Sequence, residues 1–372
     1  MSTLFSAMKP VLLTRMVEQL ALNEAVAGLL VAMPFVGLAC AALCSRWLLH
    51  RLPYRGLLWF FAACLISCEL LCAFAYTNIP ILLAAQLVAG VSVGVLMGLM
   101  SRLISGETFA DQLFGFADMI AVLLMSAMIA LIGQAVGWSG LQGGYLAAAA
   151  IAAVLGFIML CAPVRDTKLN AAQAATSNGA RPVRLEMTVQ AIATVAMGVL
   201  FVTSSGLGFA FMFTLAQNLA MDYAVASSQI GVLLFVSAFA CWVGGWCSGR
   251  FGPHLPLAVA FITCAIGWYL AIHTRSPVVF ICALVPAVFS LQFCFPIFLA
   301  MSAGLDRSGQ WAAVATPLLT SGFAWAAIAA GLIVEGFGIT ALASATIVGM
   351  LICSALLLLS REPDPRKPRL RH

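Results

Sequence analysis

The chain has 372 residues, of which 63% are hydrophobic and only 8% are charged, and its formal net charge is +5. So few polar side chains cannot cover the surface of a soluble domain, and the high hydrophobicity also excludes intrinsic disorder. The composition therefore predicts an all-α polytopic membrane protein, because a helix satisfies its own backbone hydrogen bonds in lipid. Most of the twelve cysteines lie inside apolar segments, which favours a packing role over disulfide formation or metal binding.

Apolar runs long enough to cross a bilayer, which takes about 20 helical residues, recur along the chain. The first apolar run, residues 1–16, is too short to span and contains Lys9, so it predicts only the second half of a first helix. Short connectors such as Thr77–Asn78 and Glu335–Gly336 predict antiparallel neighbours. The eleven full spans are predicted at 25–45, 57–76, 79–101, 113–136, 139–162, 188–216, 228–248, 255–273, 277–301, 311–334 and 337–360.

A polar stretch separates two groups of spans. Shifting the first group by 203 residues places Cys44 on Cys247 and Pro53 on Pro256, which indicates a repeat of two like-oriented six-helix halves. By the same comparison, we expect about fifteen residues of the first helix to be missing. The predicted units are an N-terminal bundle at 1–162, a cytoplasmic linker at 163–187, a C-terminal bundle at 188–360 and a basic cytoplasmic tail at 361–372.

The basic residues fall mainly on one side of the predicted membrane. If the linker and the tail face the cytoplasm, fifteen Lys and Arg residues lie inside, and only Arg15 and Arg275 lie outside. This bias predicts that orientation, and we expect a multi-pass protein of the plasma membrane, specifically a bacterial inner membrane. The same bias accounts for the positive net charge without a nucleic-acid partner.

The two bundles and the central linker resemble the major facilitator superfamily, whose fold has twelve helices in two pseudo-symmetric bundles. The family's loop between helices 2 and 3 usually reads Gly-x-x-x-Asp-Arg-x-Gly-x-Arg-Arg, and the matching loop here keeps Arg51 and Arg55 but lacks the carboxylate. Helix 4 of the family usually carries an Arg before a glycine series, and here Gln86 stands before a series that begins at Gly90. The resemblance implies gating roles in this loop and in its copy after helix 8, for His50, Arg51, Arg55, Arg250 and His254.

The resemblance implies a secondary active transporter that moves a small organic solute by alternating access, with proton coupling as one option. Two alternatives stay open, namely a non-transporting membrane sensor or scaffold and an inactive truncated relative. An enzyme is not expected, and neither is a cofactor, because the four histidines are far apart in sequence and no metal or phosphate-binding motif is present. We expect a monomer in the lipid bilayer whose partners are its solute and, if it is coupled, protons.

Two carboxyl groups in predicted spans are candidate proton or substrate sites, because a polar group in the membrane is costly and usually faces a cavity or a partner. Asp118 lies one to two turns into its span, where burial favours a protonated carboxyl or a bound cation; the alternative is a carboxyl near the cytoplasmic end that snorkels or forms a hydrogen bond between helices. Glu69 lies deeper, in the third helix, which in the family is peripheral, so packing and proton binding both stay open. Lys9 is a candidate for an anionic substrate, and its alternative is snorkelling to the interface.

Four uncharged residues complete the candidate substrate site. Gln86 could touch substrate, whereas the glycines that follow it favour helix packing. Gln292 offers an amide for hydrogen bonding and Phe295 an aromatic ring, a combination that is typical of a mostly apolar binding cavity. Trp325 is a candidate aromatic wall, with packing or interface anchoring as its alternatives. These groups favour amphipathic or weakly charged solutes over multiply charged ones.

Overall fold

A computed structural model describes most of the chain, and within the described part every regular element is a helix. The described residues are 29–30, 32–41, 54–105, 109–161, 188–221, 223–305 and 310–360. In the first half the labelled helices are α3 (Tyr54–Phe74), α4 (Ile79–Ser105) and α5 (Ala110–Cys161), and a shorter apolar helix covers Ala32–Ala41. The second half contains α7 (Val189–Ala210), α8 (Met212–Asn218), α9 (Tyr223–Phe251), α10 (His254–His273), α11 (Pro277–Ala303), α12 (Gln310–Phe337) and α13 (Ala341–Leu359).

Ten helices among the described residues are long and apolar enough to cross a membrane. They coincide with ten of the eleven predicted spans, and the remaining one, 25–45, contains the described helix Ala32–Ala41. The predicted partial first helix, the linker and the basic tail lie outside the described residues. The chain is therefore a multi-pass integral membrane protein.

Most helix ends lie within a few residues of the predicted bounds, and two differences are of another kind. The predicted connector Glu335–Gly336 is instead part of α12, which continues to Phe337 and ends before Gly338, where φ is +82°. The predicted span 188–216 is divided at Phe211 into α7 and α8. Within α5, Gly140 has φ +63° and ψ −151°, a conformation open essentially to glycine, and with Ser139 it forms a kink in the helix.

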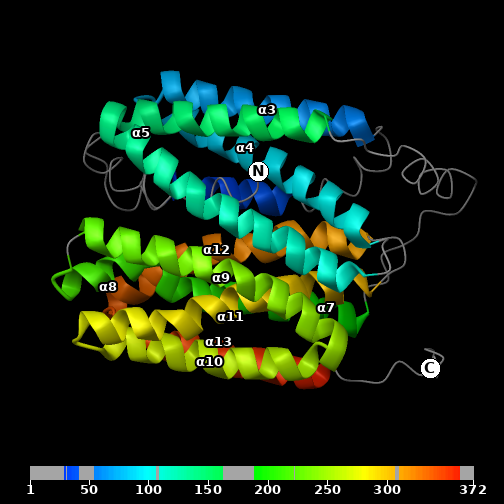
Figure 1. Ribbon diagram of the computed structural model, residues 1–372, viewed down its shortest axis with the longest axis vertical. Helices are drawn as coiled ribbons and strands as arrows, with labels where there is room; N and C mark the ends of the chain where they lie inside the picture. The colour runs from blue at the N-terminus through cyan, green and yellow to red at the C-terminus, as the bar shows by residue number, and fades with distance from the viewer. Residues whose placement is uncertain are drawn as a thin grey trace, which may run out of the picture.

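The helices form two groups that lie one above the other in Figure 1, with α3 to α5 above and α7 to α13 below. We call the end of the bundle at which α4, α9, α11 and α13 terminate the Ser101 end, and the end at which they begin the Asn78 end. The Ser101 end is on the right in Figure 1. The two groups meet where α5 packs against α9 and α11 and where α4 packs against α12.

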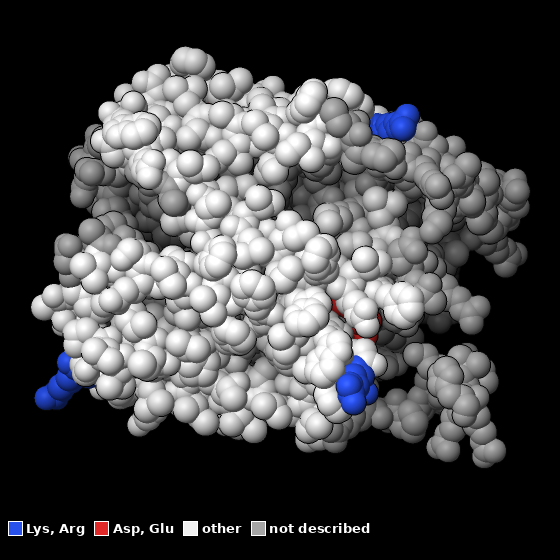
Figure 2. All heavy atoms as spheres, in the orientation of Figure 1, with Lys and Arg blue, Asp and Glu red and all other residues white. Residues whose placement is uncertain are grey.

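The outer surface is apolar. Large hydrophobic side chains such as Phe74, Trp138 and Phe337 are more than two-thirds exposed, as expected for a surface that contacts lipid tails. In Figure 2 the visible Lys and Arg side chains are scattered over a mostly uncharged face, and acidic atoms show only as a small area within a recess, just above one of the basic side chains. In the described part of the chain, the exposed basic residues Arg55, Arg250 and Arg275 lie at or next to the ends of helices.

Candidate functional site

The backbones of α5 and α9 touch through glycines. A Cβ atom added to Gly115 would lie 2.7 Å from the carbonyl oxygen of Cys241, and one added to Gly245 would lie 2.5 Å from that of Asp111. Real Cβ atoms essentially never come so close, so both positions require glycine. Small residues that let membrane helices approach are a general packing device, and here they join the two halves of the molecule.

Asp118 lies one turn beyond Gly115, about 12 Å along α5 from its first residue. Its Oδ2 atom is buried and has no hydrogen-bond partner among the described residues. The thiol of Cys241 on α9 lies within electrostatic range of Asp118. The Cys241 Sγ atom is in turn 4.0 Å from Oε1 of Gln292 on α11. Asp118, Cys241 and Gln292 thus come from three helices and meet between the two halves.

This junction suits a proton or a cation. A carboxylate without a hydrogen-bonding partner is costly in a medium of low dielectric constant, so it favours a bound proton or a nearby positive charge. The candidate Phe295 follows Gln292 on α11, is half-buried and packs against the core. We call Asp118, Cys241 and Gln292 the Asp118 junction.

A second contact between the halves is aromatic. The ring of Phe323 on α12 has its centroid 6.2 Å from Phe35 in the helix Ala32–Ala41 and also 6.2 Å from Phe209 on α7. This group could not be predicted from the sequence, because the chain has 24 phenylalanines and nothing in their spacing distinguishes these three. The group gives the interface an apolar, aromatic wall.

The Ser101 end is closed by contacts between the halves. The hydroxyl oxygens of Ser101 on α4 and Thr316 on α12 lie 2.7 Å apart. A Cβ atom on Gly98 would lie 3.0 Å from the carbonyl oxygen of Ala313, so α4 and α12 are in tight contact as well. On the α5 side, the Ser248 hydroxyl donates a 3.3 Å hydrogen bond to Asp111.

Two candidates lie together inside the first half. Glu69 on α3 is fully buried, and it is within electrostatic range of Cys72 and of Tyr145 on α5. The Gln86 amide on α4 donates a hydrogen bond of 3.3 Å to Cys72 Sγ. These polar side chains therefore gather among α3, α4 and α5, whereas Asp118 lies where α5 meets the other half.

The glycines that follow Gln86 pack helices together. A Cβ atom at Gly90 would overlap Pro34, and one at Gly94 would lie 2.5 Å from the Ala41 Cβ atom. Both neighbours belong to the helix Ala32–Ala41. Gly98 faces the other half instead, as noted above.

The remaining candidates are dispersed. Trp325 is 56% exposed on α12, on one helix face with the exposed Ile328 and Leu332. Arg55 is exposed at the start of α3, and His254 is half-buried at the start of α10. The Arg250 guanidinium lies over the rings of Trp246 and Phe251. Lys9, His50 and Arg51 lie outside the described residues.

Comparison with known families decides the assignment. Residues 1–314 match the family model described as Major Facilitator Superfamily. The chain belongs to the major facilitator superfamily. This membership agrees with the two-group helical fold and with its tight contacts between halves. A search of curated protein sequences found no significant match.

Solved structures of the superfamily share the fold. The transporter FucP, the fucose:proton symporter of E. coli, in its outward conformation aligns with a TM-score of 0.71 at 13% identity, over 97% of this chain and 98% of that one. The proton:xylose symporter XylE, bound to 6-bromo-6-deoxy-D-glucose, gives 0.72 at 13% identity over 96% and 93%. The human organic anion transporter MFSD10 (TETRAN) gives 0.72 at 14% identity over 96% and 97%. The chain has the fold of a secondary transporter.

Proposed function

We propose that this superfamily member moves a small organic solute across the membrane by alternating access and that Asp118 binds the coupling proton. The observation that carries the proposal is the position of Asp118, whose Oδ2 atom is buried without a hydrogen-bond partner among the described residues, between α5 and the second half. A carboxyl group at such a boundary changes its surroundings when the halves separate, so its proton affinity depends on the conformation.

The two halves that move in this proposal are the N-terminal bundle, 1–162, and the C-terminal bundle, 188–360, joined by the linker 163–187. Contacts at the Ser101 end, among them Ser101–Thr316 and Asp111–Ser248, are those that must break when this end opens. At the glycine contacts, no large side chains of α5 and α9 interlock, so the two helices can slide or rock against each other.

The Ser101 end is the cytoplasmic end in this proposal. Its support is the distribution of Lys and Arg in the sequence, which is typical of a linker and tail on the cytoplasmic side of a plasma membrane. Fusion of green fluorescent protein and of alkaline phosphatase to the C terminus tests the orientation in bacteria. We expect fluorescence from the first fusion and no phosphatase activity from the second; the reverse pattern contradicts the orientation.

The proposed class of cargo follows from the uncharged side chains among the candidate residues. Gln292 supplies an amide, and Phe295 and the Phe323 group supply apolar rings, a combination that suits neutral or weakly charged amphipathic solutes. Of the structural neighbours, FucP and XylE are described as proton symporters of sugars, and MFSD10 is described as an organic anion transporter. Monosaccharides and organic anions therefore form the first panel of solutes to test. Organic amines are added because the Asp118 carboxyl is also a candidate for a cationic substrate.

Proton-coupled transport is tested in proteoliposomes that contain a pH-sensitive dye. Each solute of the panel is added outside, and the measured quantities are solute uptake and the change in internal pH. For a transported solute we expect uptake to follow an imposed pH gradient in the wild type and to lose this dependence in D118N, while solute exchange without a gradient persists. E335Q makes the same chemical change at an exposed carboxyl and is the matched control.

The outcomes separate the alternatives. If D118N follows the gradient as well as the wild type, Asp118 does not carry the proton. If a solute stabilises the protein against heat but no solute crosses the membrane, the non-transporting sensor or scaffold replaces the transporter.

A further inference from the structure

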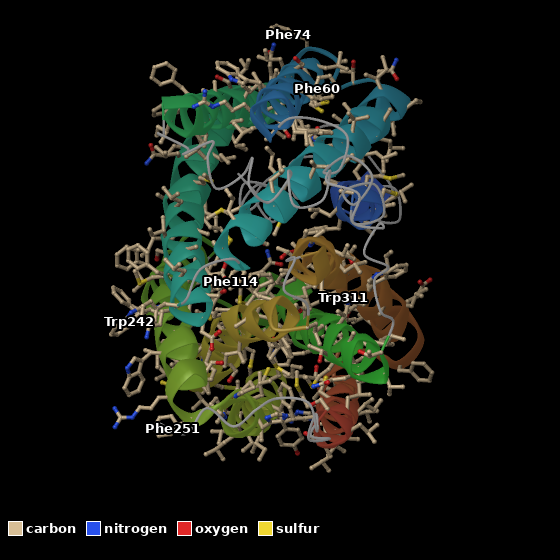
Figure 3. The ribbon with its side chains drawn as sticks, turned by 90° about the vertical axis from the view of Figure 1, so that its right-hand side faces the viewer. Phe60, Phe74, Phe114, Trp242, Phe251 and Trp311 are labelled. Carbon is tan, nitrogen blue, oxygen red and sulfur yellow. The ribbon has the colours of Figure 1, made fainter. Side chains whose placement is uncertain are left out.

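Helix α9 has two faces of opposite character. In the last third of the helix, the face toward α5 and α11 is built from small or polar residues, and the other face is exposed and aromatic. Packing residues on the first face are Cys241, Gly244, Gly245 and Ser248. Exposed aromatic residues on the outer surface of α9 are Phe235, Phe239, Trp242 and Trp246. Figure 3 shows Trp242 and Phe251 at the outer edge of the molecule.

This aromatic face ends in a positive charge at the Ser101 end. Arg250 lies one turn after Trp246, and its Cζ atom is 5.4 Å from the centroid of the Trp246 ring. The same atom is 5.7 Å from the Phe251 ring, and the two rings meet edge to face at 6.1 Å. The rings hold the guanidinium by cation–π contacts, which Arg favours over Lys because its planar group stacks.

Among the described residues, no carboxylate neutralises the charge of Arg250. Its described contacts are the two aromatic rings. Space is open beside it, since a Cβ atom added to Gly249 or Gly252 would meet no atom within 4 Å. A fixed, accessible cation therefore lies at the end of an apolar stripe that faces lipid.

We propose that Trp246, Arg250 and Phe251 form a binding site for an anionic phospholipid. The lipid phosphate pairs with the Arg250 guanidinium, and one acyl chain lies along the aromatic face of α9. Anionic headgroups are attracted to basic residues at the membrane surface, and tryptophan rings prefer the headgroup level. The occupant is a membrane lipid rather than a soluble phosphate, because the contact surface below the charge is apolar for several helical turns.

Lipid retention by the purified full-length protein tests the site. The protein in detergent is mixed with equal amounts of phosphatidylglycerol and phosphatidylcholine, and native mass spectrometry counts the lipids that stay bound. We expect the wild type to prefer phosphatidylglycerol and R250Q to lower that preference about fivefold, the factor expected for one basic residue at a charged surface. R250K should keep part of the preference, because it retains the charge but not the planar stack.

The matched control is Arg275, an exposed cation at the Asn78 end. R275Q removes the same charge without touching the aromatic stripe, so it should leave the preference unchanged. W246L, which leaves Arg250 in place, should lower the preference about threefold by removing a stacking ring. Equal retention of phosphatidylcholine by all variants shows that they are folded.

Three results would overturn the site. One is a preference unaffected by R250Q, and another is an equal fall in R250Q and R275Q, which would indicate only an effect of net charge. The third is displacement of the lipid by millimolar glycerol phosphate, which would mean that a soluble anion suffices. None of these measurements requires transport, so the lipid site and the proposed function can fail separately.

Discussion

Ser101 on α4 and Thr316 on α12 join the two halves of the molecule through hydroxyl oxygens 2.7 Å apart. Both side chains are buried, and Gly98 brings the same two helices into close contact one turn away. The distance between these two side chains must increase when the Ser101 end opens, so it distinguishes the open from the closed state of this end.

We predict that a disulfide at this point blocks transport. In S101C/T316C the two sulfur atoms take the places of hydroxyl oxygens that lie 2.7 Å apart. Two sulfur atoms so close to each other can form a disulfide. Oxidation should form the bond and abolish solute uptake, and reduction should restore it, because the halves cannot separate while they are bonded. A protease site inserted in the linker detects the bond, since only cross-linked halves migrate together on a denaturing gel.

Each single variant, S101C or T316C, serves as the control for oxidation of the native cysteines. Full uptake by the oxidised double variant, with the cross-link verified on the gel, would mean that the Ser101 end stays closed throughout the cycle. Alternating access at this end would then be wrong.

The close contact of α5 with α9 predicts a strong effect of side-chain volume. In G245V the new side chain meets the Asp111 carbonyl oxygen and the Gly115 backbone, so the helices must move apart. We expect a loss of about 1–3 kcal/mol in the free energy of unfolding, as for other overpacked sites, together with reduced uptake. Denaturation followed by circular dichroism in detergent measures the stability.

G249A is the control for this prediction, because it lies one turn further along α9 where an added Cβ atom meets nothing. Its expected change is within about 1 kcal/mol and in the stabilising direction, since alanine favours helix over glycine. If G245V and G249A had the same stability, the contact between α5 and α9 would not be as close as described.

The fold could be predicted from the sequence to a large extent, because the length of apolar runs is a local property. The boundary at α12 was missed, since Gly336 stays helical and the turn comes only at Gly338, where φ is positive. The break at Phe211 was also missed, because no Gly or Pro stands at or directly beside it and Gly206 and Gly208 stay helical.

The candidate site was only partly predictable for a related reason. Asp118 stands out as a carboxyl in an apolar run, but its neighbours Cys241 and Gln292 come from other helices and are ordinary residues in sequence. From the sequence, Glu69 was a candidate for packing or proton binding and Gln86 a candidate for substrate contact. Only packing distinguishes them from Asp118, because Gln86 bonds Cys72 within the first half.

The two tryptophans Trp268 and Trp325 should differ sharply in their effect on stability. Trp268 is fully buried, its indole Nε1 donates a 3.4 Å hydrogen bond to Ser205, and a Cβ atom on Gly208 would overlap its ring. W268A should therefore lower the free energy of unfolding by about 3–5 kcal/mol through the cavity it leaves. W325A, at a site 56% exposed, should cost less than about 1 kcal/mol.

Transport by W325A separates the two interpretations of that residue. If Trp325 forms a wall of the substrate site, uptake falls while stability is retained. If it faces lipid, as its exposed neighbours Ile328 and Leu332 suggest, uptake is unchanged. We expect the second result, and a solute affinity reduced by W325A would contradict it.

Glu69 provides the last test, because the sequence left packing and proton binding open for it. The residue is fully buried within electrostatic range of Cys72 and Tyr145, both of which belong to the first half. A carboxyl placed inside one half keeps the same neighbours when the halves rock, so its proton affinity has little reason to change during transport. We therefore expect E69Q, which keeps the shape of the side chain, to retain uptake driven by a pH gradient.

The neighbouring Tyr145 supports a separate measurement on the same cluster. Its hydroxyl is buried and has no hydrogen-bond partner among the described residues, so Y145F should leave the free energy of unfolding unchanged within about 1 kcal/mol. If instead Y145F and E69Q both abolish the response to the gradient while D118N retains it, the proton path runs through the first half. In that case Glu69 would replace Asp118 as the coupling residue, and the Asp118 junction would serve only to pack α5 against α9.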